Sequence, residues 1–111
     1  MTDKPIRWIG SSLDDLTKFP ESARRKTGFQ LRAIQSGDTA SDFKAMPIVG
    51  LGVEEIRIRT DDDYRIFYVD RFAEAVYVLH AFQKKTQKTS KSDIEIGQKR
   101  YQQMLKHRQS E

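Results

Sequence analysis

The chain of 111 residues contains no cysteine, only two histidines and no long apolar run. Without cysteine there is neither a disulfide framework nor a thiolate metal site. His80 and His107 stand far apart in the sequence, so we expect no histidine metal cluster. We also expect no cofactor and no small-molecule ligand. No stretch approaches the roughly 20 apolar residues of a membrane span, and the first residues lack the apolar core of a signal peptide. We therefore expect a soluble, cytoplasmic protein without a membrane partner.

The length and the apolar content favour one domain over residues 1–111. Hydrophobic residues make up 37% of the chain, which is enough for a modest core at this size.

Positive charge is concentrated near the C-terminus. Residues 83–111 hold eight lysines and arginines against three acids, whereas residues 1–82 hold twelve against thirteen. Such an asymmetry indicates a surface for a polyanion such as nucleic acid. A solvated basic helix that keeps the protein in solution is the alternative.

The order of hydrophobic patterns predicts an α+β fold. Turn residues and periodicity divide the chain into a strand, two helices, a loop, three strands and a last helix. The first strand covers Pro5 to Ile9, a helix follows Ser12, a second helix runs from Pro20 to Gly37, a polar loop fills 37–50, and the later strands cover 53–59, 64–70 and 75–82. Short connections between the later strands favour an antiparallel meander.

Alternation in the strand at 53–59 separates two kinds of side chain. Ile56 and Ile58 point to one face of the predicted sheet, and Arg57 and Arg59 point to the other. We expect the isoleucines to pack against the helices and the arginines to line the opposite face.

The last helix is expected to begin with a capping box at Ser92 to Glu95. Its apolar stripe consists of Ile94, Tyr101, Met104 and Leu105. This stripe either packs on the domain or is captured by a partner.

Three segments together resemble the RelE/ParE toxin superfamily, and in particular the HigB-type phage-derived toxins of type II toxin–antitoxin modules. They are Leu51 to Arg59, Tyr64 to Val69, and Val78 to Thr89. The resemblance implies a small twisted antiparallel sheet with an N-terminal helical hairpin on one face and a C-terminal helix. It also implies an endoribonuclease that cleaves messenger RNA in the ribosome and inhibits translation. The alternatives are a ParE-like inhibitor that binds DNA gyrase, or an inactive module that only binds its antitoxin.

Cleavage without a metal would use attack by the RNA's own 2′-hydroxyl, which requires stabilisation of the extra negative charge on phosphorus. The resemblance places the basic residues for this task on the central strands and just after the last one, at Arg57, Arg65, Lys84 and Lys85. Arg65 is expected to clamp the scissile phosphate. His80 is a candidate acid or base by its intrinsic chemistry.

Further RNA contacts are expected from basic and aromatic side chains around these positions. They are Arg59, Tyr68, Phe82, Lys88, Lys91 and Lys44. Each candidate also has a structural interpretation: the arginines could pair with Glu55 or the acids at 61–63, the lysines could bind only ribosomal RNA, and the aromatic residues could pack in a core.

The resemblance implies an antitoxin partner, usually a HigA-like helix-turn-helix protein, besides the ribosome and messenger RNA. Related ribonucleases often carry an aromatic or histidine general base near the C-terminus. Here Tyr101 falls in the apolar stripe of the last helix, so the proton acceptor is not identified.

Overall fold

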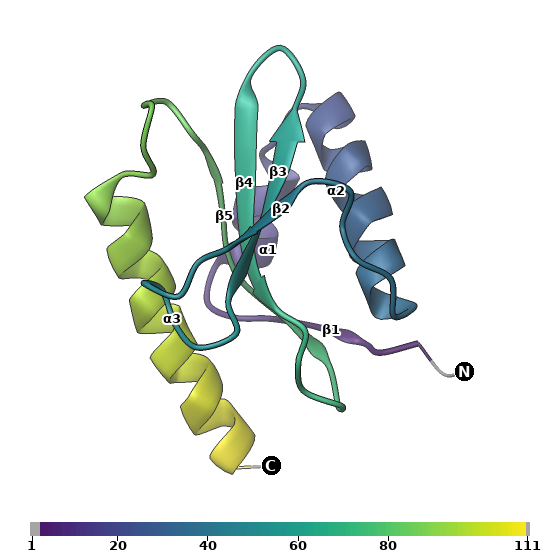
Figure 1. Ribbon diagram of the computed structural model, residues 1–111, viewed down its shortest axis with the longest axis vertical. Helices are drawn as coiled ribbons and strands as arrows, with labels where there is room; N and C mark the ends of the chain where they lie inside the picture. The colour runs from purple at the N-terminus through teal and green to yellow at the C-terminus, as the bar shows by residue number, and fades with distance from the viewer. Residues whose placement is uncertain (1–2, 111) are drawn as a thin grey trace.

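The computed structural model describes residues 3–110 and shows an α+β fold in which helices lie on both faces of one sheet (Figure 1). Eight elements follow one another along the chain. They are β1 (Ile6–Trp8), α1 (Ser12–Thr17), α2 (Glu21–Gln35), β2 (Phe43–Ala45), β3 (Glu54–Arg59), β4 (Asp63–Val69), β5 (Val76–Gln83) and α3 (Lys91–Gln109).

The five strands form a mixed sheet in the order β1-β5-β4-β3-β2. The meander of β3, β4 and β5 is antiparallel, as expected, and β2 joins it antiparallel to β3. The resemblance implied an antiparallel sheet, whereas in the structure β1 lies parallel to β5. The two helices after β1 carry the chain back across one face, so β1 lies at the far edge from β2 and points in the same direction as β5.

The segment 37–50, expected to be a loop throughout, contains the short strand β2. Its three residues are all exposed and pair only with Glu54 to Ile56 of β3. The prediction missed it because an exposed edge strand of this length carries no buried side-chain pattern.

The two N-terminal helices form as their sequences predict, with one difference at the start of α1. Ser12 was expected to precede the helix but is its first residue, where it is buried and its hydroxyl donates to the Val78 carbonyl over 3.1 Å. In α2 the buried residues recur at helical spacing and are Ala23, Thr27, Leu31 and Ile34. Gly37 follows this helix with φ of 95°, a conformation that glycine adopts without strain.

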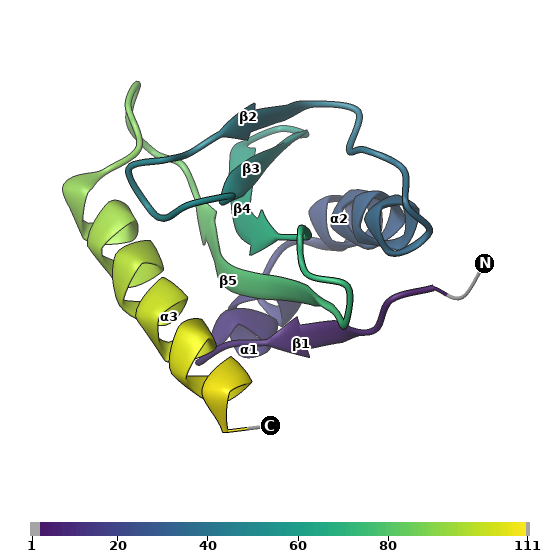
Figure 2. The same ribbon diagram turned by 60° about the horizontal axis from the view of Figure 1, so that its bottom comes forward.

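The sheet separates two hydrophobic clusters. On the face that α1 and α2 cover, the isoleucines Ile56, Ile58 and Ile66 pack with Leu31 and Ile34, which confirms the expected orientation of β3. On the face that α3 covers, Phe67 and Leu79 pack with Met104. Figure 2 shows α3 along one side of the sheet and α2 along the other.

The helix α3 begins two residues earlier than the capping box at Ser92 predicted. Ser90 is the N-cap: its hydroxyl accepts from the Asp93 backbone N–H over 3.1 Å and donates to the Asp93 carboxylate over 2.7 Å. The apolar stripe packs on the sheet, and the Tyr101 hydroxyl donates to the Leu51 carbonyl over 3.0 Å. Among the described residues, no helix is long and apolar enough to cross a membrane.

Candidate nucleic-acid interface

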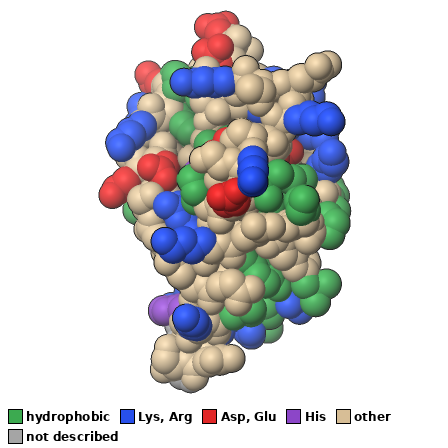
Figure 3. Space-filling model, turned by 90° about the vertical axis from the view of Figure 1, so that its left-hand side faces the viewer, with side chains coloured by type: hydrophobic (Ala, Val, Ile, Leu, Met, Phe, Trp, Pro, Cys, Tyr) green, Lys and Arg blue, Asp and Glu red, His purple; other side chains and the backbone are tan. Residues whose placement is uncertain are grey.

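Four cationic side chains that lie far apart in the sequence line one groove of about 290 Å³, here called the basic groove. Its cations are Lys44, Arg57, Lys84 and Lys88, and Glu55 lies among them. Figure 3 views the molecule from the side on which α3 lies, where Lys and Arg side chains are widespread and acidic side chains lie among them. The excess of cations in the basic groove suits a polyanionic ligand.

Sheet pairing brings these side chains together. Lys44 of β2 stands opposite Glu55 of β3 in the register, and Arg57 follows two residues later on the same face of β3. Lys84 comes directly after β5, where its backbone N–H donates to the Asp63 carbonyl over 2.7 Å. Each cation is thus positioned by a strand or by the residue that follows one, with Lys88 on the loop before α3.

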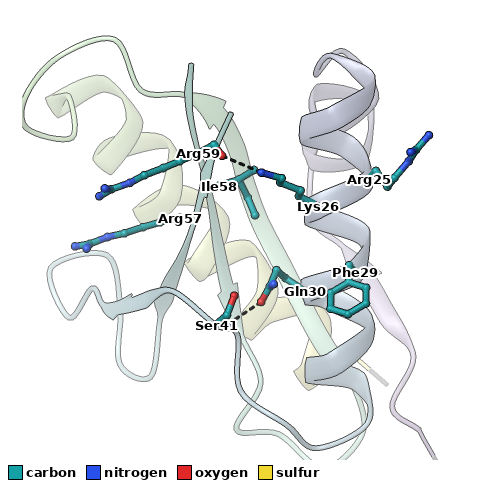
Figure 4. Close-up of a pocket in the computed structure, with 8 residues that line it drawn as sticks. All are labelled: Arg25, Lys26, Phe29, Gln30, Ser41, Arg57, Ile58 and Arg59. Carbon is teal, nitrogen blue, oxygen red and sulfur yellow. Dashed lines mark hydrogen bonds between the residues drawn. The ribbon is translucent and has the colours of Figure 1, made fainter. Parts of the chain in front are cut away.

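The arginines of β3 turn their charged groups toward this side of the sheet. Figure 4 shows the side chains of Arg57 and Arg59 extending away from α2, whereas Lys26 of α2 reaches the Arg59 carbonyl over 3.2 Å. A hollow of about 450 Å³ lies between α2 and β3. The side chains of Arg57 and Arg59 extend away from that hollow. We therefore assign their guanidinium groups to the face on which α3 lies.

A wider and more open groove of about 750 Å³ adjoins the basic groove at Lys84. Lys85 and Arg59 also line it, but so do the three consecutive acids Asp61, Asp62 and Asp63. These carboxylates offset the cations, so the basic groove is the better candidate for a phosphate.

Arg65, which was expected to clamp the scissile phosphate, is buried with 3% of its side chain exposed. Its guanidinium lies 2.8 Å from the Asp63 carboxylate and 3.4 Å from that of Glu55. Arg57 stands directly opposite Arg65 on the neighbouring strand, where like charges repel each other. The two carboxylates offset this repulsion. Arg65 lines the wider groove and not the basic groove, whereas Arg57 is half-buried and lines the basic groove.

His80 does not line the basic groove, although a register shift in β5 brings it to the same face of the sheet as Glu55. Phe67 pairs with His80 and Tyr68 pairs with Val78, so one residue of β5 is skipped. His80 therefore lies on the same face as Phe67, and its ring stacks on Phe82 at 4.7 Å between centroids.

The His80 imidazole is held by α3. Its Nε2 atom lies 2.8 Å from the Asp93 carboxylate. Burial lowers the pKa of His80, and the hydrogen bond and charge of Asp93 offset this only in part. The nitrogen Nδ1 is buried and has no hydrogen-bond partner among the described residues. These features describe a neutral, packed histidine that holds α3 against the sheet.

The aromatic candidates are also packed. Tyr68 lies in the core under α1 and α2, and its hydroxyl donates to the Glu54 carboxylate over 2.8 Å. Burial and that carboxylate raise its pKa. Phe82 is 8% exposed beneath His80. Lys91, in contrast, is exposed at the start of α3 and lies 3.9 Å from Glu95.

Residues 14–102 match the family described as Phage derived protein Gp49-like (DUF891). The chain belongs to this family. The Gp49-like family is associated with RelE-like and other toxin-like proteins. The matched segment runs from α1 into α3 and contains every cation of the basic groove. No curated protein matches the chain.

Within this Gp49-like domain, the prediction from sequence missed two groups in the basic groove. Glu55 and Thr89 both line it, and their side chains approach to 3.4 Å. The alternation of β3 placed Glu55 on the same face as Arg57, but an acid between arginines is more typical of a surface ion pair. Residues 3–110 contain no group of three or more His, Cys, Asp or Glu side chains placed to hold a metal ion.

Proposed function

We propose that this Gp49-like protein is the toxin of a type II toxin–antitoxin pair and that it cleaves messenger RNA on the ribosome. The convergence of Lys44, Arg57, Lys84 and Lys88 on the basic groove is the observation that supports this function. The four side chains come from two strands and from the residues after a third, so their convergence is a product of the fold.

The reaction that suits the groove is transfer of the phosphodiester to the adjacent 2′-hydroxyl, with departure of the 5′-oxygen. We assign contact with the reacting phosphate to Arg57 and Lys84, because both line the groove, are half-buried and are held by the sheet. Preorganised donors act on the charge that develops on phosphorus, and loss of one such donor costs about 3 kcal/mol in other enzymes. Lys44 and Lys88 are exposed at the rim and bind the neighbouring phosphates.

The remaining cations extend this surface toward ribosomal RNA. Three exposed cations flank the groove, namely Lys85, Arg59 and Lys91. Such contacts are independent of sequence and salt-sensitive. An antitoxin, for which we propose a HigA-like helix-turn-helix protein, would neutralise the toxin by covering this surface or by keeping it from the ribosome.

Primer extension on RNA from a translating extract tests the proposal. We expect new 5′ ends after addition of the purified protein, and few on the same RNA without ribosomes. The variant Lys84→Ala with Lys88→Ala should lose these ends. The matched control Lys99→Ala with Lys106→Ala removes the same charge from exposed positions on α3 and should retain them.

Two results would contradict the proposed ribonuclease activity. Accumulation of gyrase-cleaved DNA without new RNA ends would indicate a ParE-like gyrase inhibitor. Tight antitoxin binding without growth arrest or new ends would indicate an inactive binding module.

A further inference from the structure

Among the residues that the structure describes, Glu55 is the only acid that lines the basic groove, and it is buried there. Its side chain is 4% exposed, while the groove around it holds four cations. A carboxylate at this place repels phosphate, so the binding of a polyanion does not explain its presence.

The contacts of the Glu55 carboxylate are long for ionic hydrogen bonds. Its Oε1 atom lies 3.4 Å from Arg65 Nη1 and 3.8 Å from Arg57 Nε, and its Oε2 atom lies 3.4 Å from the Thr89 hydroxyl. Charge-assisted hydrogen bonds are normally about 2.7–2.9 Å long. The carboxylate is thus neutralised by nearby charge while its oxygens remain able to accept a closer hydrogen bond.

Arg65 has a closer partner than Glu55. The guanidinium lies 2.8 Å from Asp63, which is shorter than its 3.4 Å approach to Glu55. Support for Arg65 therefore comes mainly from Asp63. The carboxylate of Glu55 lies instead between Arg65 below and Arg57 at the groove wall, next to the cations assigned to the reacting phosphate.

We propose that Glu55 is the proton acceptor for the 2′-hydroxyl in the proposed cleavage, on which this inference rests. The carboxylate takes the hydroxyl proton as the 2′-oxygen forms its bond to phosphorus. The bond from phosphorus to the 5′-oxygen breaks, and that oxygen takes a proton from a lysine ammonium of the groove or from water. The products are a 2′,3′-cyclic phosphate, a 5′-hydroxyl and a protonated Glu55, which returns its proton to solvent.

Single-turnover cleavage on programmed ribosomes tests this role. Glu55→Gln preserves shape and removes the proton acceptor, so we expect cleavage to slow by about 10²–10⁴-fold. Binding of the toxin to the ribosome should stay the same or tighten, because a repulsive charge is lost. Glu21→Gln makes the same substitution at an exposed carboxylate on α2, outside the basic groove, and it should cleave within about threefold of the wild type.

A message with sulfur in place of the scissile 5′-oxygen separates the two proton transfers. Sulfur leaves without a proton, so this substrate bypasses a missing proton donor but not a missing acceptor. The defect of Glu55→Gln should therefore persist on it. If Glu55→Gln does not fold, Glu55→Asp retains the charge between the arginines, and it should fold and bind while its cleavage is reduced.

Three results would overturn the assignment. Cleavage by Glu55→Gln near the wild-type rate would show that Glu55 is not the proton acceptor. Loss of ribosome binding in proportion to cleavage would show that Glu55 only positions the complex. In both cases the wild-type protein still cleaves RNA, so the proposed function is unaffected. Absence of cleavage by the wild type itself overturns the proposed function, and the assignment fails with it.

Discussion

The guanidinium of Arg65 lies 2.8 Å from the Asp63 carboxylate, and the Arg65 side chain is only 3% exposed. Removal of one partner from a buried ion pair leaves an uncompensated charge and costs about 3–5 kcal/mol. Asp63 is 35% exposed, so solvent reduces the cost on its side, but the nearby Glu55 carboxylate is buried and would lose a neighbour.

We therefore expect Arg65→Ala to lower the free energy of unfolding by about 3 kcal/mol. Urea denaturation followed by circular dichroism measures this change. Arg59→Ala removes an exposed arginine of the neighbouring strand and should change the free energy of unfolding by less than about 0.5 kcal/mol. A stable Arg65→Ala variant that has lost RNA cleavage would instead favour direct contact of Arg65 with phosphate.

The salt dependence of RNA binding tests the basic groove independently of cleavage. For single-stranded RNA, the slope of log K against log salt changes by about 0.7 for each phosphate contact. Lys84→Ala with Lys88→Ala should thus reduce the slope by about 1.4 in fluorescence anisotropy titrations of a labelled oligonucleotide. The control Lys99→Ala with Lys106→Ala should leave it unchanged. Equal reductions in both variants would show diffuse attraction rather than a groove.

The pair His80 and Asp93 links stability to pH. The pKa of His80 is lowered by burial in the folded protein, so the unfolded chain binds the proton more readily. The stability that neutral His80 contributes is present above its unfolded pKa of about 6.5 and is lost as the pH falls through the lower folded value. We expect the melting temperature to decrease below about pH 6.5.

His80→Gln keeps a donor to Asp93 but has no titrating ring, so its melting temperature should decrease less over the same pH range. Thermal melts of both proteins measure the difference. Parallel curves for the wild type and His80→Gln would show that other groups dominate this acid sensitivity.

The close contact of α3 with the sheet predicts opposite effects of alanine at two helical glycines. A Cβ atom at Gly97 would approach Phe67 to 2.8 Å and Val49 to 2.9 Å, whereas one at Gly28 of α2 meets nothing within 4 Å. Overpacking of a core costs about 1–3 kcal/mol, and alanine in a helix gains about 1 kcal/mol over glycine.

Gly97→Ala should therefore destabilise the protein by up to about 2 kcal/mol, and Gly28→Ala should stabilise it by about 0.5–1 kcal/mol. Denaturant midpoints of the two variants measure these effects. Stabilisation by both substitutions would show that α3 can move away from the sheet at little cost.

Local patterns in the sequence predicted most of the elements. Helical spacing in α2 and alternation in β3 follow from which residues must be buried, so Ile34 and Ile58 lie as expected. The short exposed strand β2 and the parallel pairing of β1 were not predicted. Both depend on contacts between distant segments and leave no periodic pattern in three residues.

Among the candidate site residues, the sequence indicated the basic character but not the accessibility. Lys84 and Arg57 line one groove, whereas Arg65 is buried and paired with acids. His80 shows the limit of local patterns most clearly, because one skipped residue in β5 reverses the face on which it lies.

The sequence by itself determined the α+β order of elements, the two-sided character of β3 and the excess of positive charge after β5. These properties are local, since they depend on residue type and on spacing along one element. Only the tertiary structure decided that Lys44, Arg57, Lys84 and Lys88 meet around Glu55. That arrangement depends on strand register and on the packing of α3, which set distances between side chains far apart in the chain.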